Sequence, residues 1–550
     1  MNRYKILLLL VVVFVAFFLR FIRLADNPPS LTWDEVAWGY NAYSLGVDGK
    51  DEFGRFLPFD YLESFGDFKP PVYAYLTILP VKLFGLNEFA VRFPSAFFGS
   101  LTILISCFLI REVFYQSKNR DMYALASAGI LAISPWHINL SRAAFEANLA
   151  TFFIVGGVWL FLLAIRKNMW ILVLSALMFA LSINTFNSAR IFSPLIVFIL
   201  SLSNYKFLLK NKKQTFAAIA VGFLIILPTL PFLFSPQAKL RFDEVNIFTD
   251  ISIIERTNSQ IYLDNNAWWS KVIHNRRFAY AMEFIKHYLD NLSPKFLFIS
   301  GDGNPKFSTQ DVGQMFLWEI PFFVAGIFFL FHKKEGKWWI VPAWLMLGLI
   351  PAGVARETPH ALRVEAALPT FQIFTGYGVV NLVLLLNKNL KLFFLSREFI
   401  KLSIIGLFFI IFINFFYYIH GYHTFYPKEF SGEWQYGYKE AISFIESEYA
   451  EYDRVYFTEA LGRPYIYFLF YLKYPPFAFQ KSSDINREAL GFVHVNRFDK
   501  YYFAKDISTF SEKPGKNLYI EVPSQVPENA KVLKTFKLLN GKPSLVAYTL

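Results

Sequence analysis

The sequence has few charged residues and a single cysteine. Asp, Glu, Lys and Arg make up 17% of its 550 residues, whereas a soluble protein of this length would carry about 25%. Together with 55% hydrophobic and 19% aromatic residues, this deficit excludes an ordinary soluble protein and indicates a membrane protein. Because Cys107 is the single cysteine, it cannot form a disulfide within the chain. It lies in an apolar run and is expected to be a packing residue.

Motifs for metal and nucleic-acid binding are also missing. The chain has no Cys-x-x-Cys or His-Glu-x-x-His pattern, so we predict no metal site and no cofactor. The net charge of +12 comes mostly from basic residues in short gaps between apolar runs. This distribution favours contact with a membrane surface and not with nucleic acid. Arg20 and Arg23 follow the first apolar stretch where a cleavage site would need small residues, so this stretch is interpreted as an uncleaved span.

Long apolar runs predict a polytopic α-helical membrane protein. A crossing helix needs about 20 mostly apolar residues, because its backbone must satisfy its own hydrogen bonds. Eleven plausible crossings centre near residues 15, 102, 129, 157, 176, 197, 223, 323, 346, 375 and 411. The region 70–86 is apolar but short and bounded by proline, so it is expected to be an interfacial helix.

The gaps between these runs alternate in charge. Basic clusters occur near residues 3–5, 111–120 and 166–167, from residue 204, from 332 and from 387. By the positive-inside rule these gaps and the N-terminus are cytoplasmic, in the plasma (inner) membrane. The other gaps are then outside: 25–92, 137–147, 184–190, 235–312, 351–363 and everything after 420. The predicted domains are a multi-spanning domain over 1–420, with long outer loops at 25–92 and 235–312, and an extracytoplasmic α/β domain over 421–550. In the latter a helical segment is followed by strand-like patterns in "DRVYFT", "KNLYIEV", "KVLKTFKLL" and "PSLVAYTL".

Every short outer gap carries ionisable residues. They are Asp34, Glu35, Asp67, Lys69, Arg92, His137, Arg142, Glu146, Arg190, Asp302, His360 and Arg363. Charges near a membrane are costly and often functional, although loop ends are wet and carry charges anyway. Paired acids with separated cations suit a transfer reaction in which a phosphate leaves, because an acid deprotonates the attacking hydroxyl and cations hold the phosphate. A single phosphate can be held by Lys and Arg without a metal.

Several ordered elements resemble one enzyme family. They read "WDE" at 33–35, "FKPPVYAYL" at 68–76, "FGLNEFAVRFPSAFFGSLTIL" at 84–104 and "SPWHINLSRAAFEANL" at 134–149. From about residue 5 to 380, the chain resembles the GT-C glycosyltransferases of glycosyltransferase family 39, the protein O-mannosyltransferase group, and the related lipid A aminoarabinose transferases.

The resemblance implies a role for each matching residue. Asp34 would be the catalytic base, with Glu35 completing the acidic pair and orienting the acceptor. Lys69 would contact the phosphate of a polyprenyl- or dolichyl-phosphate monosaccharide, and Arg92 falls on an Arg-x-Pro-Ser element. With the remaining outer-face residues we expect donor-phosphate contacts from Lys69, Arg92, Arg363 and His360, and other substrate contacts from Arg142, Glu146, Arg190 and Asp302.

The resemblance also implies an inverting, single-displacement transfer to an acceptor hydroxyl on the outer face of the membrane. The expected partners are the bilayer, the lipid-phosphate sugar and a glycan, lipid or protein acceptor. The loop 235–312 is too short for the β-trefoil domain of the eukaryotic enzymes, so the acceptor does not carry over. We expect a bacterial or archaeal enzyme of the cell envelope.

Two alternatives stay open. A metal-dependent oligosaccharyltransferase would need a Trp-Trp-Asp element, and this chain has Ser270 at the third position of "WWS". A transporter or flippase for a lipid-linked sugar would also need cations near the membrane. Such proteins often have internal repeats, and none is evident here.

Overall fold

The structure, a computed structural model, describes residues 1–388, 397–487, 493–507 and 514–550. Its residues divide into two compact units. Unit 1 comprises Met1–Leu19, Phe98–Leu140 and Glu146–Tyr418, and unit 2 comprises Arg20–Phe97, Ser141–Phe145 and Ile419–Leu550. The predicted domains follow the chain order, whereas these units do not, because residues 20–97 cluster with the C-terminal region. Residues 389–396 of the predicted basic cluster from 387 lie outside the described residues.

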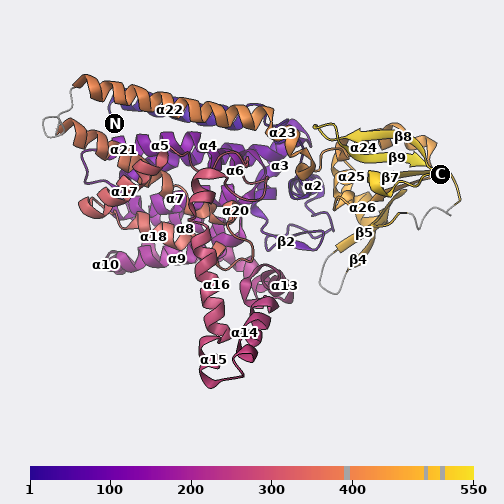
Figure 1. Cartoon of the computed structure of the whole chain (residues 1–550), viewed down its shortest axis with the longest axis horizontal. Helices are drawn as coiled ribbons and strands as arrows, with labels where there is room; N and C mark the ends of the chain where they lie inside the picture. Colours follow the sequence, from indigo (N-terminus) through magenta and orange to yellow (C-terminus); the bar gives the residue numbers. More distant parts are fainter. Residues whose placement is uncertain (389–396, 488–492, 508–513) are drawn as a thin grey trace. The chain divides into compact units, whose positions relative to one another are not determined.

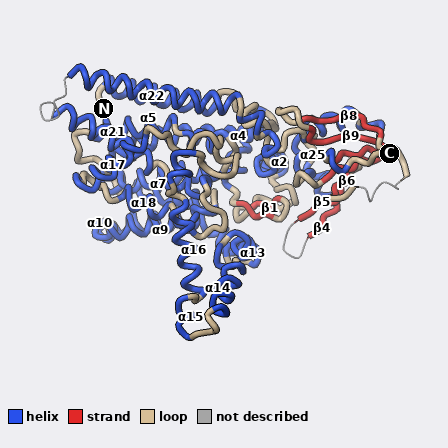
Figure 2. Tube along the Cα trace, in the orientation of Figure 1, coloured by secondary structure: helices blue, strands red, loops and turns tan. Residues whose placement is uncertain are grey.

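Unit 1 consists of helices (Figures 1 and 2). Wholly or in part, it contains α1 (Arg3–Phe21), α4 (Glu88–Val113), α5 (Arg120–Ile133), α6 (Pro135–Arg142), α7 (Glu146–Arg166), α8 (Ile171–Ile183), α9 (Asn187–Ser203), α10 (Tyr205–Lys210), α11 (Lys212–Ile226), α12 (Leu230–Leu233), α13 (Pro236–Val245), α14 (Ile251–Leu263), α15 (Trp268–Ile273), α16 (Arg276–Asp290), α17 (Glu319–Lys333), α18 (Ile340–Gly348), α19 (Ile350–Gly353), α20 (Ala361–Val364), α21 (Thr370–Lys388) and α22 (Arg397–Thr424).

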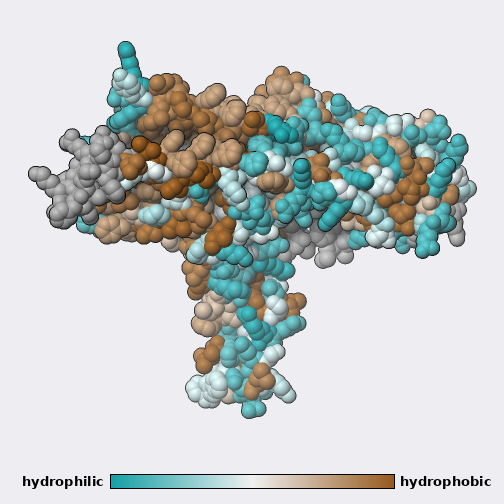
Figure 3. Space-filling model, turned by 45° about the horizontal axis from the view of Figure 1, so that its top comes forward, coloured by the Kyte–Doolittle hydropathy of each residue, from teal (hydrophilic) through white to brown (hydrophobic). Residues whose placement is uncertain are grey.

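A helix occupies each of the eleven predicted centres. Among the described residues, six segments are long and apolar enough to cross a membrane: Arg3–Phe21, Glu88–Val113, Glu146–Arg166, Lys212–Leu233, Thr370–Asn387 and Ile405–Glu429. The multi-pass helical membrane fold is therefore confirmed, while the count of eleven crossings is not. Hydrophobic side chains gather over the helices of unit 1 in Figure 3, as expected for surfaces that face lipid.

Unit 2 holds the first long loop and the C-terminal domain. Besides the start of α4 and the end of α22, its elements are α2 (Trp33–Asp48), β1 (Leu62–Ser64), β2 (Asp67–Lys69), α3 (Val72–Phe84), α23 (Tyr426–Glu429), α24 (Tyr438–Ser447), α25 (Pro464–Tyr471), α26 (Pro476–Ser482), β3 (Arg454–Thr458), β4 (Asp484–Arg487), β5 (Val493–Phe498), β6 (Tyr501–Ala504), β7 (Asn517–Glu521), β8 (Lys531–Lys537) and β9 (Pro543–Thr549). With 13 residues, α3 is shorter than the about 20 needed to cross, in keeping with the helix predicted at 70–86.

The C-terminal strands form one mixed sheet in the order β4-β5-β6-β3-β7-β9-β8. The central strand β3 pairs in parallel with β6 and β7, and the outer pairs are antiparallel. Residues of β3 alternate between the two faces. Phe457 packs against Tyr438 of α24 and Phe468 of α25, and Tyr456 stacks on Tyr519 of β7. Tyr456 is also buried in a cluster with Ile507 and Tyr548. Side chains on both faces of the central strand are therefore buried, which explains why it reads as a nearly continuous apolar run.

Candidate active site

A capping box fixes the start of α2. The Oγ1 atom of Thr32 accepts a hydrogen bond from the backbone N–H of Glu35 (3.4 Å), and Oε2 of Glu35 accepts one from the backbone N–H of Thr32 (3.0 Å). This reciprocal pair satisfies two backbone donors that a helix start would otherwise leave open. Asp34 is thereby held in the first turn of the helix, where the aligned peptide dipoles favour a negative charge.

A short hairpin brings Lys69 to Asp34. Strands β1 and β2 pair antiparallel, with Leu62 opposite Lys69, and the turn residues Phe65 and Gly66 have positive φ angles of 46° and 81°. Such a two-residue turn matches the twist of the two strands. The Lys69 ammonium then forms an ion pair with Oδ1 of Asp34.

The two partners of this ion pair differ in exposure. The Lys69 side chain is 7% exposed and that of Asp34 is 46% exposed. The Lys69 Nζ atom lies 5.1 Å from the ring centroid of Trp38 and 4.7 Å from that of Phe65, and aromatic faces attract a cation. The ammonium of Lys69 is thus nearly buried and fixed in orientation, while the carboxylate of Asp34 remains accessible to solvent.

Glu35, the next residue, is buried inside the protein and pairs with Arg92. Both side chains are fully buried, with Arg92 Nε 2.9 Å from Oε1 of Glu35 and Nη2 3.3 Å from Oε2. The backbone N–H of Ala144 also donates to Oε1 (2.9 Å). The other N–H groups of Arg92 donate to the carbonyls of Leu24, Pro28 and Ser30. All five donors of the guanidinium are therefore used inside the protein, which leaves none for the donor phosphate that the sequence assigned to Arg92.

A second buried arginine holds the same segment of chain. Arg142 donates from Nη2 to the carbonyls of Ile22 (2.7 Å), Arg23 (3.3 Å) and Asn27 (2.9 Å). With the three contacts of Arg92, six carbonyls of residues 22–30, which we call the strap, accept hydrogen bonds from two arginines. The strap ends shortly before Thr32, so these six hydrogen bonds position the start of α2 and with it Asp34. The sequence predicted a substrate contact for Arg142, and in this structure Arg142 contacts these backbone carbonyls.

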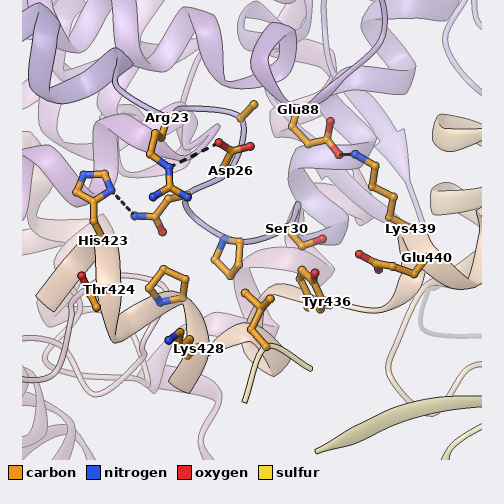
Figure 4. A pocket seen from close by; sticks show the side chains of 15 residues that line it. Arg23, Asp26, Ser30, Glu88, His423, Thr424, Lys428, Tyr436, Lys439 and Glu440 are labelled. Atoms are coloured by element: carbon orange, nitrogen blue, oxygen red, sulfur yellow. Dashed lines mark hydrogen bonds and ion pairs between the residues drawn. The ribbon is translucent and has the colours of Figure 1, made fainter. Parts of the chain in front are cut away.

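The strap also forms one wall of a cavity of about 520 Å³ in unit 2 (Figure 4). Glu88 and Lys439 form an ion pair there (2.7 Å), and Arg23 lies 3.7 Å from Asp26. Its lining includes three acidic side chains, Asp26, Glu88 and Glu440, and three basic ones, Arg23, Lys428 and Lys439. The lining residues are Arg23, Ala25, Asp26, Asn27, Pro29, Ser30, Glu88, His423, Thr424, Pro427, Lys428, Tyr436, Lys439, Glu440 and Leu539.

The other predicted site residues lie in unit 1. Asp302 accepts hydrogen bonds from the backbone N–H groups of Asn304 (2.8 Å) and Ala361 (2.6 Å), and burial raises its pKa to about 6. Burial and the nearby charge of Arg363 lower the pKa of His360 to about 3, so this ring is neutral at pH 7. It can therefore offer a phosphate a hydrogen bond, as a predicted phosphate contact, but not a positive charge.

Three more predicted residues are also in unit 1. Arg363 donates to the carbonyl of Glu357, and Glu146 is the first residue of α7. The negative charge of Glu146 reaches Glu365, which is fully buried. The guanidinium carbon of Arg190 lies 5.7 Å from the ring centroid of Phe232. The predicted residues therefore form one connected group in unit 2 and a second set in unit 1.

The structure adds Glu52, which the sequence interpretation missed. Glu52 is fully buried and accepts hydrogen bonds from Tyr465 (2.9 Å), Asn41 (2.9 Å) and Ser64 (3.0 Å). Its burial raises its pKa to about 8. Because Asn41 belongs to α2 and Ser64 to β1, this carboxyl joins the helix of Asp34 to the hairpin of Lys69. Nothing in its local sequence marked it, whereas the Thr-x-x-Glu pattern at 32–35 could have predicted the capping role of Glu35.

Comparison with known proteins gives a family match over part of the chain and a shared fold. Residues 68–232 match the family model described as dolichyl-phosphate-mannose-protein mannosyltransferase. The matched segment contains Lys69 and Arg92. A search of curated proteins finds no match.

Two solved structures of ArnT from Cupriavidus metallidurans share the architecture. The apo form aligns with a TM-score of 0.55 and 13% identity over 98% of this chain and 97% of that chain. The form bound to undecaprenyl phosphate aligns with a TM-score of 0.53 and 14% identity over 99% and 97%. The apo oligosaccharyltransferase of Archaeoglobus fulgidus has a TM-score of 0.49, with 14% identity over 86% of this chain and 64% of that chain.

These two findings agree with the resemblance carried by the sequence motifs. The family match over residues 68–232 and the ArnT-like fold support the predicted membrane glycosyltransferase of the GT-C type, related to the protein O-mannosyltransferases and to the lipid A aminoarabinose transferases.

Proposed function

We propose that the chain transfers a monosaccharide from a polyprenyl-phosphate donor to an acceptor hydroxyl, with Asp34 as general base and Lys69 as the phosphate-binding cation. The observation that carries this proposal is the ion pair between these two residues at the start of α2. In this ion pair the more accessible carboxylate, that of Asp34, contacts the nearly buried ammonium of Lys69. A base and an anion-binding group therefore lie next to each other.

The reaction needs both groups at the same moment. The acceptor hydroxyl gives its proton to Asp34 as its oxygen attacks the anomeric carbon. The bond from that carbon to the phosphate oxygen breaks, and its electron pair leaves with the polyprenyl phosphate. Lys69 stabilises the charge that builds on the departing phosphate. A single displacement of this kind inverts the anomeric centre.

Donor binding would also free the base. Without donor, Lys69 neutralises Asp34. A phosphate that binds to Lys69 competes for its N–H donors and weakens the contact with the carboxylate. Asp34 is then available as a proton acceptor only when the leaving group is in place. ArnT has been solved with undecaprenyl phosphate, which supports a lipid phosphate as the donor class for this chain.

Glu35 and Arg92 position the site and do not touch substrate in this proposal. Four hydrogen bonds already hold the two oxygens of Glu35, so it is poorly placed to complete a metal site with Asp34. The proposed chemistry uses a lysine where a metal-dependent enzyme would use a divalent cation. We further propose that catalysis takes place on the extracytoplasmic side, because the basic gaps of the sequence are expected to be cytoplasmic.

The test is a transfer assay with purified full-length protein. It is incubated with polyprenyl-phosphate sugars and cell-envelope fractions, with and without EDTA, and products are followed by mass spectrometry. Transfer that persists in EDTA and is lost in Asp34→Asn is expected. Loss of transfer in EDTA would favour a metal-dependent oligosaccharyltransferase-like reaction. Movement of a lipid-linked sugar across vesicles without any transfer would favour a flippase.

A further inference from the structure

Residues 250–290 form a helical hairpin in unit 1 that we call the arm. It consists of α14, α15 and α16, and Figure 1 shows it extending away from helices such as α7, α9 and α18, across their direction. Its side chains are distributed in an unusual way. The buried residues of the arm are Ile253, Thr257, Ser270 and His287, of which three are polar.

Polar contacts also hold the two long helices of the arm together. Glu283 of α16 accepts from Arg256 of α14 (3.2 Å) and lies 3.2 Å from the His287 ring. At the tip, Ser270 donates to Asp264 (2.7 Å). An arm that is surrounded by water would bury its apolar residues between its helices instead.

The apolar residues of α16 form an outward stripe. Phe278, Met282, Ile285 and Leu289 are 56%, 49%, 48% and 55% exposed. Their spacing of four, three and four residues puts them on one face of a helix. None of these side chains is packed into the arm.

The tip combines exposed aromatic and aliphatic residues with basic ones. Trp268 is 79% exposed and Trp269 44%, and Val272 and Ile273 beside them are 66% and 54% exposed. Basic side chains follow within a few residues, at Lys271, Arg276 and Arg277. Tryptophan concentrates at the boundary between acyl chains and water, and basic residues are attracted to anionic headgroups.

The base of the arm, where its two helices join the rest of unit 1, lies near the ends of apolar helices. The candidate span Lys212–Leu233 ends shortly before it. Tyr288 donates to the carbonyl of Met346 in α18 (2.7 Å), and His287 contacts the carbonyl of Ala355 just past α19 (2.8 Å). An element rooted at that level and running across the helices would lie along the membrane surface.

The arm cannot itself cross the hydrocarbon core, because it carries five acidic and five basic residues in 41 positions: Asp250, Glu255, Asp264, Glu283 and Asp290, and Arg256, Lys271, Arg276, Arg277 and Lys286. We infer that the arm lies flat in the interfacial layer of an anionic phospholipid leaflet, with the α16 stripe toward the acyl chains and the tip cations among the phosphates. The arm would thus anchor the loop laterally, beyond the bundle.

Site-directed spin labelling of the full-length protein in phosphatidylglycerol-containing nanodiscs tests this inference. In a Cys107→Ala background, single cysteines replace Phe278, Met282, Ile285 and Leu289. Matched controls are Glu255→Cys and Ser259→Cys, which are exposed polar positions on α14. Collision rates are measured with oxygen, which partitions into lipid, and with a water-soluble nickel chelate.

The ratio of oxygen to nickel collisions is expected to be severalfold higher at the four stripe positions than at the two controls. Equal nickel access at all six positions would overturn the inference, because the arm would then lie in water. Low access to both reagents at the stripe would also overturn it, because a protein surface would then cover α16. The readout does not depend on sugar transfer, so it is separate from the test of the proposed function.

Discussion

Asp34 and Glu35 are adjacent in sequence, yet the ion pairs that they form differ in burial. The pair of Asp34 with Lys69 has one partner 46% exposed, whereas the pair of Glu35 with Arg92 is fully buried. Asp34 is half-exposed and can meet substrate, whereas Lys69 is nearly buried, so losing this ion pair should cost less stability than losing the fully buried one. A buried pair is fixed by hydrogen bonds on all sides, and breaking it is costly. Substitutions at the two pairs should therefore separate catalysis from folding.

The largest effect is expected for Asp34→Asn. Removing the general base should lower the transfer rate about 10²–10⁴-fold, while the melting temperature falls much less than in Glu35→Ala. Transfer is measured with purified protein and stability by thermal unfolding in the same detergent. Asp484→Asn, which changes another half-exposed carboxylate of unit 2, is the matched control and should alter neither quantity. An Asp34→Asn enzyme with full activity would remove Asp34 from the chemistry.

Glu35→Ala should act mainly on folding. It leaves the Arg92 guanidinium buried without its charge partner, which costs about 3–5 kcal/mol. The expected result is a large fall in melting temperature or in the yield of folded protein. The double variant Glu35→Gln with Arg92→Met should recover part of that loss, because it removes both charges. If Glu35→Ala kept the wild-type melting temperature and lost transfer, Glu35 would belong to the chemistry, as the sequence first suggested.

Lys69→Ala should weaken donor binding, with a smaller loss of stability than in Glu35→Ala. One charge-assisted hydrogen bond is worth about 1.5–3 kcal/mol, which corresponds to about a 10- to 100-fold rise in the donor KM. Lys69→Arg keeps the charge but changes its shape, so it should recover the donor KM only in part. Steady-state kinetics against donor concentration measure both. An unchanged donor KM and rate in Lys69→Ala would contradict the proposed contact.

Glu52 provides a pH-dependent effect on stability behind the pair of Asp34 and Lys69. Its pKa in the folded protein is raised to about 8 from an ordinary value of 4.5, so the folded state binds its proton more tightly than the unfolded state. Stability should therefore fall as the pH rises from about 4.5 to about 8. In Glu52→Gln this part of the pH dependence should disappear, as measured by melting temperature at several pH values. Parallel curves for the two proteins would show that Glu52 does not titrate in this range.

Much of the helical framework could be predicted from the sequence, because crossing helices need long apolar runs and few other structures do. Strand β3 and strands β7 to β9 were predicted for a similar reason, since each has a strongly apolar or alternating pattern. Strands β4 to β6 were missed. Their residues include His494, Asn496 and Arg497 between apolar ones, and β6 is defined by its pairing with β3, which local sequence does not contain.

The candidate site was predictable in its residue types but not in its pairings. The motif order indicated Asp34 and Lys69, yet only the hairpin of β1 and β2 explains how residues 35 positions apart meet. The destination of Arg92 depends on carbonyls of the strap, which every residue possesses, so no sequence signal marks it. Glu52 depends in the same way on partners from α2, β1 and α25.

The contact between Asp34 and Lys69 also bears on how such an enzyme could be blocked. A simple phosphate analogue would form an ion pair with Lys69 and would offer no cation to the carboxylate of Asp34. A compact zwitterion, with an anionic end for one side chain and an ammonium end for the other, would replace both halves of the contact at once. Inhibitors of this design should gain selectivity from a geometry that phosphate-binding proteins without a neighbouring acid do not share.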